Sequence, residues 1–133
     1  MKEHAQPSFD GPSLFAAFRE NRDKRPDSAA FLIAAGDRFV PISWRQFVAD
    51  VETAAHLVRT RAPGATIGLL GENSYEWVVV HAACLFSGAV AIPVDMNLTP
   101  VEISERMKFT GAVALVHSSL YEDKAREAGH LTP

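Results

Sequence analysis

Three glycines flank or interrupt a short apolar run in the middle of the chain: Gly64, Gly68 and Gly71. Glycines at a strand-to-helix junction can let a dinucleotide phosphate approach the backbone, but the spacing here is not G-x-G-x-x-G. The loop over 71–74 leads into a predicted helix, whose start can bind anions, yet Glu72 would repel a phosphate there. We therefore interpret the glycines and the loop as turn and capping features.

Standard catalytic motifs are absent from the sequence, which has neither the G-x-x-x-x-G-K-[ST] phosphate loop nor the G-x-S-x-G nucleophile elbow. Histidines occur without H-E-x-x-H or C-x-x-C spacing, which predicts no metal site. They are His4, His56, His81, His117 and His130. His81 is interpreted as a packing residue. Cys84 lies in an apolar segment that should raise its pKa and leave the thiol inert.

Three carboxylates follow the second strand predicted below: Asp95, Glu102 and Glu105. Parallel sheets bind ligands at the carboxyl ends of their strands, so Asp95 is a candidate site residue. The alternative, which we favour, is an Asx turn over 95–98. The carboxylates lack the flanking histidine, lysine or hydroxyl of a catalytic set. We therefore assign no catalytic, cofactor-binding or metal-binding residue.

The second half of the chain alternates short apolar runs with helical patterns. Strands are predicted over 66–70, 90–94 and 112–116, and helices over 75–87, from 100 to near Gly111, and from 118 or 119 to near Gly129. Ser74 and Thr99 are expected helix N-caps, with Glu102 completing a capping box. Either Ser118 or Ser119 is expected to cap the last helix. Strands alternating with helices imply a parallel sheet with right-handed crossovers.

The first half predicts a helix, a hairpin and a longer helix. Ser13 can cap a helix that runs to about Arg22. Two apolar runs, 29–33 and 38–42, flank the turn residues 34–37 and suggest a β-hairpin. Ser43 and Gln46 have capping-box spacing before an amphipathic helix over 44–60. The fold class is therefore α/β and three-layered, with a mostly parallel sheet over 66–129 preceded by these elements.

The predicted helix over 75–87 is apolar almost all round. Such a helix needs cover on most sides. We therefore expect it to pack against something that the chain does not contain, and we expect exposed apolar surface and an open sheet edge to favour a homodimer.

Composition sets the remaining bounds. The chain has 133 residues, 47% of them hydrophobic, and a net charge of −3. That length suits a single domain over 13–133 after a flexible leader over 1–12. The charge gives no nucleic-acid footprint, and no apolar run is long enough for a membrane span. A lone cysteine and no signal-peptide pattern predict a cytoplasmic protein.

Several segments together resemble the N-terminal part of the adenylate-forming enzymes, which include acyl-CoA synthetases, luciferases and peptide-synthetase adenylation domains. The segments are 71–77 (GENSYEW), 85–95 (LFSGAVAIPVD), 97–103 (NLTPVEI) and 42–47 (ISWRQF), with Trp44 in place of the usual tyrosine. The resemblance covers most of 13–129. It implies a family chemistry that joins a carboxylate to ATP and then usually transfers the acyl group to coenzyme A.

The resemblance also implies that the catalytic segments lie downstream. The Ser/Thr/Gly-rich loop with lysine and the Thr-Glu segment that the family uses are not present here. We expect an incomplete N-terminal subdomain of an acyl-CoA synthetase-like fold, excised or truncated, that binds no cofactor alone. ATP, Mg and coenzyme A belong to the complete ligase, and the expected partner is its remainder or a complementary chain.

Two other interpretations remain open at this point. The chain could be a stand-alone binding or scaffold module that pairs with a partner chain. A flavodoxin-like or receiver-like domain also alternates strands and helices. A receiver needs an acidic cluster after its first strand and an aspartate after a later one, whereas His117 follows the third run here.

Overall fold

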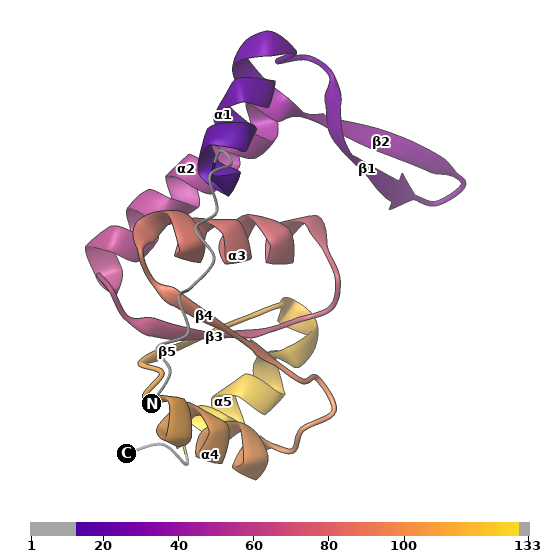
Figure 1. Ribbon diagram of the computed structural model, residues 1–133. Helices are drawn as coiled ribbons and strands as arrows, with labels where there is room; N and C mark the ends of the chain where they lie inside the picture. The colour runs from indigo at the N-terminus through magenta and orange to yellow at the C-terminus, as the bar shows by residue number, and fades with distance from the viewer. Residues whose placement is uncertain (1–12, 131–133) are drawn as a thin grey trace, which may run out of the picture.

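The computed structural model describes residues 13–130, so the predicted leader over 1–12 and the last three residues of the predicted domain lie outside the described residues (Figure 1). The elements in chain order are α1 (Leu14–Lys24), β1 (Ala29–Ala35), β2 (Arg38–Ser43), α2 (Trp44–Arg61), β3 (Thr66–Leu70), α3 (Tyr75–Ser87), β4 (Val90–Val94), α4 (Pro100–Thr110), β5 (Ala114–His117), the 3₁₀ turn η1 (Ser119–Tyr121) and α5 (Glu122–His130).

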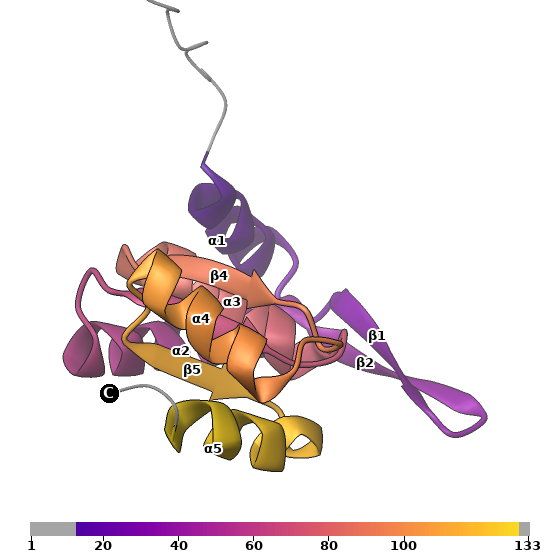
Figure 2. The same cartoon turned by 90° about the horizontal axis from the view of Figure 1, so that it is seen from below.

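Three parallel strands form the centre of the molecule, in the order β4-β3-β5. Figure 1 shows α3 and α2 above this sheet and α4 and α5 below it, and Figure 2 shows α4 and α5 from below. The predicted three-layer α/β fold with a parallel sheet is confirmed. The remaining strands, β1 and β2, form a separate antiparallel pair.

The side chains of β3 alternate between the two faces of the sheet. Ile67 and Leu69 pack with Cys84 of α3, whereas Leu70 packs with Ile103 of α4 on the opposite face. A strand covered on both faces has to be apolar throughout, which is why 66–70 forms one continuous apolar run.

The β-hairpin extends away from the sheet (Figure 1). Ala34 and Ala35 pair with Phe39 and Arg38, so the four-residue turn predicted over 34–37 shortens to two residues. Gly36 supplies the positive φ of 67° that a two-residue turn requires. β1 therefore runs to Ala35, beyond its predicted apolar run, whereas β2 begins at Arg38 as predicted.

The helix caps agree with the prediction in part. The reciprocal box of Thr99 and Glu102 is present. Ser43 accepts a hydrogen bond from the backbone of Gln46, but the Gln46 amide donates to Asp50 instead of returning to Ser43, so this capping box is wrong. A carboxylate one turn further along is the stronger acceptor for that amide.

The end of the chain differs from the prediction in its boundaries. The third strand covers Ala114–His117 instead of 112–116, and the 3₁₀ turn separates it from the last helix. Ser118 makes no cap hydrogen bond with its side chain; its hydroxyl donates to Glu72. Of the two predicted serine caps, the one at Ser118 is therefore wrong.

The apolar helix α3 is covered in part within this chain. Val79, Ala82, Ala83 and Cys84 are buried, and Phe86 lies against Phe15 and Phe18 of α1. Leu85 is the exposed apolar residue of this helix. α1 and α2 lie over the side that the sheet leaves free, but Trp77, Val78 and Val80 are only half-buried, so cover from outside the chain remains a prediction.

Candidate functional site

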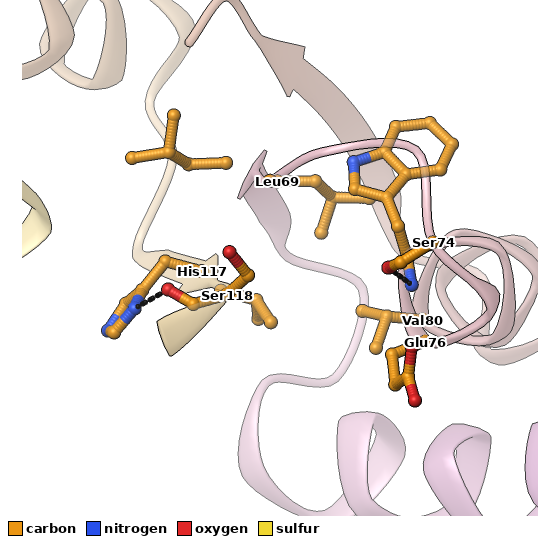
Figure 3. A pocket seen from close by; sticks show the side chains of 10 residues that line it. Leu69, Ser74, Glu76, Val80, His117 and Ser118 are labelled. Carbon is orange, nitrogen blue, oxygen red and sulfur yellow. Dashed lines mark hydrogen bonds between the residues drawn. The ribbon is translucent and has the colours of Figure 1, made fainter. Parts of the chain in front are cut away.

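A small pocket lies at the carboxyl end of the sheet, where β3 and β5 end beside the start of α3 (Figure 3). Its volume is about 80 Å³. Its walls are mostly apolar and include Leu69, Trp77, Val80 and Val116. Ligand sites for cofactors usually measure about 300 Å³ or more, so this pocket admits a small apolar group and not a nucleotide.

The polar groups around the pocket already have structural partners. The Ser74 hydroxyl accepts the backbone N–H of Trp77 at 3.1 Å and caps α3. Nδ1 of His117 lies 3.0 Å from the backbone oxygen of Ser118 (Figure 3). No hydrogen bond between the described side chains pairs His117 with Ser118 Oγ, so these residues do not form an activated nucleophile.

One contact joins the two loops that follow the strands. Ser118 Oγ donates to Glu72 Oε2 at 2.6 Å, across 46 positions of the sequence. This hydrogen bond lowers the pKa of Glu72, so its carboxylate stays ionised near neutral pH. A negative charge at this loop disfavours phosphate, which supports the interpretation of 71–74 as turn and cap.

The acidic residues after β4 also have structural roles. Asp95 Oδ1 accepts hydrogen bonds from the backbone and side chain of Asn97 at 2.9 and 3.0 Å, which confirms the predicted Asx turn. The carboxylate of Glu102 accepts hydrogen bonds from the backbone N–H and the hydroxyl of Thr99, and these bonds lower the pKa of Glu102. Glu105 is exposed. The structure therefore does not gather Asp95, Glu102 and Glu105 into a catalytic cluster.

The two reactive side chains of α3 are both packed. The imidazole of His81 lies against the ring of Trp77, with centroids 5.0 Å apart. Cys84 is a buried free cysteine, and burial raises the pKa of its thiol, as predicted. Within residues 13–130, no group of three or more His, Cys, Asp or Glu side chains could hold a metal ion.

A half-buried polar contact that the sequence did not reveal lies between α2 and α3. Tyr75 donates its hydroxyl to Asp50 Oδ2 at 2.6 Å, and burial together with this bond raises the pKa of Tyr75. Tyr75 also packs against Phe31 and Phe47. Periodicity placed Asp50 off the apolar face of its helix, and no local pattern indicated which helix would lie opposite.

Ser118→Ala should reduce stability in a pH-dependent way. Because the folded state lowers the pKa of Glu72, this contribution is present above about pH 4.5 and is lost as the pH falls through the folded pKa. Urea denaturation across this range should show a difference between wild type and Ser118→Ala that shrinks at low pH. In the Glu72→Gln background the same substitution should show no such pH dependence; an unchanged pH dependence there would contradict the assignment.

The fold and the pocket can be compared with known proteins. A family model described as "AMP-binding enzyme" matches residues 18–132. The chain belongs to this family. The match runs from α1 to beyond α5 and includes every segment on which the sequence resemblance rests.

Individual relatives agree with the family. A fatty acid–[acyl-carrier-protein] ligase, MmaC, from Mycobacterium marinum is 27% identical over 99 residues, which cover 73% of this chain and 18% of that protein. A protein assigned as a long-chain-fatty-acid CoA ligase from Rhodopseudomonas palustris has a TM-score of 0.79 and 23% identity, covering 95% of this chain and 32% of the other. O-succinylbenzoate coenzyme A synthetase from Bacillus subtilis, solved with AMP, has a TM-score of 0.71 and 20% identity, covering 86% and 29%.

The chain thus spans about a third or less of the length of these relatives. The likeness to the two solved structures shows a shared fold. None of the helices in the described part of the chain is long and apolar enough to cross a membrane.

Proposed function

We propose that this chain is the N-terminal structural subdomain of an AMP-forming ligase that activates a carboxylic acid, with fatty acids as the favoured substrate class. The family match over residues 18–132 carries this proposal. The fatty acid ligase from M. marinum supports the substrate class. In the complete enzyme, ATP with Mg activates the carboxylate and a thiol such as coenzyme A receives the acyl group.

The role we propose for residues 13–130 is architectural. The polar side chains at the carboxyl end of the sheet serve caps, turns and the contact of Ser118 with Glu72. The pocket there is too small for a nucleotide. The segments that the family uses for catalysis are absent from the sequence, so the chain alone neither forms an acyl-adenylate nor binds ATP tightly. The single cysteine favours a cytoplasmic location for the complete enzyme.

Pyrophosphate exchange tests this role directly. The 133-residue chain, incubated with ATP, Mg and a panel of fatty and aryl acids, should exchange labelled pyrophosphate no faster than a protein-free blank. A polypeptide that continues in the same reading frame through a Ser/Thr/Gly-rich loop should exchange with at least one acid. Clear turnover by the 133-residue chain would refute the architectural role.

A separate chain that supplies the rest of the enzyme is the second candidate, and the exposed apolar side chains on β5 and near it favour it. Val113 and Leu120 are among them. A reading frame that stops at residue 133, together with a co-purifying ligase fragment that restores exchange, would support this candidate over a continuous polypeptide.

A further inference from the structure

The sequence contains three methionines, and the structure describes two of them in contrasting surroundings. Met107 belongs to α4 and is 7% exposed, and its sulfur occupies the space that a side chain at Gly68 of β3 would need. Met96 lies in the loop between β4 and α4 and is half-buried. The two thioethers therefore differ in their access to solvent.

The sulfur of Met96 has a hydrogen-bond donor beside it. The hydroxyl of Tyr121 donates to Met96 Sδ at 3.0 Å, across 25 positions of the sequence. Both side chains pack against the core cluster that contains Ile103. A thioether sulfur is a weak acceptor, whereas methionine sulfoxide carries a polar oxygen on the same sulfur. The Tyr121 hydroxyl therefore lies where an oxidised Met96 would need a donor.

The backbone around Met96 is held by other bonds. Lys124 Nζ donates to the backbone oxygen of Met96 at 2.6 Å. The Asx turn of Asp95 with Asn97 fixes the neighbouring residues, and the N–H of Leu98 donates to the backbone oxygen of Asp95 at 3.2 Å. These bonds do not involve the side chain of Met96. A chemical change at its sulfur therefore leaves the bonds that hold this loop intact.

We propose that Met96 is a site of reversible oxidation to methionine sulfoxide, and that the Tyr121 hydroxyl accommodates the modified side chain by donating to the new oxygen. The oxidant class is a hydroperoxide, with hydrogen peroxide as the simplest member. A sulfur lone pair attacks one peroxide oxygen, and the S–O bond forms as the O–O bond breaks. Proton transfer from the protonated sulfoxide to the released hydroxide gives sulfoxide and water. Sulfur loses two electrons and the peroxide gains them.

Timed oxidation with hydrogen peroxide, followed by mass spectrometry, tests the choice of site. Cleavage after glutamate places Met96 in a peptide over 77–102 and Met107 in a peptide over 106–122, and fragment ions assign the added oxygen to methionine. In the folded 133-residue chain, Met96 should be oxidised at least about fivefold faster than Met107, which reacts only when the fold opens. In denaturing urea the two rates should converge. Equal rates in the folded chain, or faster oxidation of Met107, would overturn the proposal.

The part played by Tyr121 is measured in a Met107→Leu background, so that oxidation of Met107 does not contribute. Oxidation of Met96 should lower the urea midpoint of unfolding only slightly in this protein. When Tyr121→Phe is added, the same oxidation should lower the midpoint by about 0.5 M more, because the sulfoxide oxygen then lacks its donor. An equal loss with and without the tyrosine hydroxyl would show that Tyr121 does not bind the modified side chain, and would overturn the proposal.

Two controls tie the effect to Met96. Methionine sulfoxide reductases of both epimer specificities should restore the midpoints, since they return the sulfoxide to the thioether. Met96→Leu in the same background should keep its midpoint after treatment with peroxide. A midpoint that falls in the Met96→Leu protein, or that the reductases do not restore, would place the damage at another residue and contradict the proposal. Neither result depends on the proposed function, because no step uses ATP or an acyl group.

Discussion

Phe47→Ala should lower the free energy of unfolding by about 3–5 kcal/mol. The Phe47 side chain is 1% exposed and lies where α1, α2, α3 and the hairpin meet. Its ring centroid is 4.9 Å from that of Phe31 and 5.0 Å from that of Phe18. Truncation removes these contacts and leaves a cavity that the surrounding helices can close only in part, so both losses add.

A loss of this size is a large share of the stability of a single domain, which is about 5–15 kcal/mol. The measurement is urea denaturation followed by far-UV circular dichroism. Phe109→Ala is the matched control, because Phe109 is 90% exposed and its removal should change stability by less than about 0.5 kcal/mol. Equal effects of the two substitutions would show that the four elements do not share a core at Phe47.

Gly68→Val should destabilise the fold by about 1–3 kcal/mol through overpacking. A Cβ atom at Gly68 would lie 2.7 Å from Met107 Sδ and 3.0 Å from a methyl group of Leu115. The first contact is too short for unbonded atoms and the second is tight, so the side chains of Met107 and Leu115 would have to shift or α4 would have to move away from β3. Valine adds two methyl groups to this Cβ atom, so the steric overlap is harder to remove by small shifts.

Two controls isolate this cause. Gly129→Val introduces the same side chain at an exposed position, where a Cβ meets nothing within 4 Å, and should leave stability nearly unchanged. In a Met107→Ala background, Gly68→Val should cost less than in wild type, because the atom that it strikes is gone. A cost that is the same in both backgrounds would mean that strand conformation, and not contact with α4, requires glycine at this position.

The order and type of the elements followed from local patterns. The uninterrupted apolar run over 66–70, the Ser74 cap and the Thr99 capping box each depend on residues no more than a few positions apart. Such patterns can be recognised in a sequence because the interactions behind them are local, and the structure has all three. The segments that carry the family resemblance also coincide with caps and strand ends, which is why they indicated architecture without indicating a catalytic residue.

Contacts between segments far apart in the chain could not be predicted from local sequence patterns. Ser118 was one of two expected caps of the last helix, but the parallel pairing of β5 with β3 brings its hydroxyl to Glu72, to which it donates. The partial cover of α3 by other elements of the chain was also not evident from local patterns. Whether an apolar helix is buried depends on which other elements reach it, and here α1 and α2 pack over it.

Gly68 joins the two kinds of information. Its place inside a strand could be deduced from the apolar residues on either side. Glycine lowers the stability of a strand interior, and the sequence did not explain why it occurs there. The packing supplies the reason, since the side chains of Met107 and Leu115 occupy the space that a Cβ atom at this position would need. The family, the α/β class and the element order are properties of local sequence and motif order; the pocket and the Glu72–Ser118 contact arise when strands far apart in the chain become neighbours.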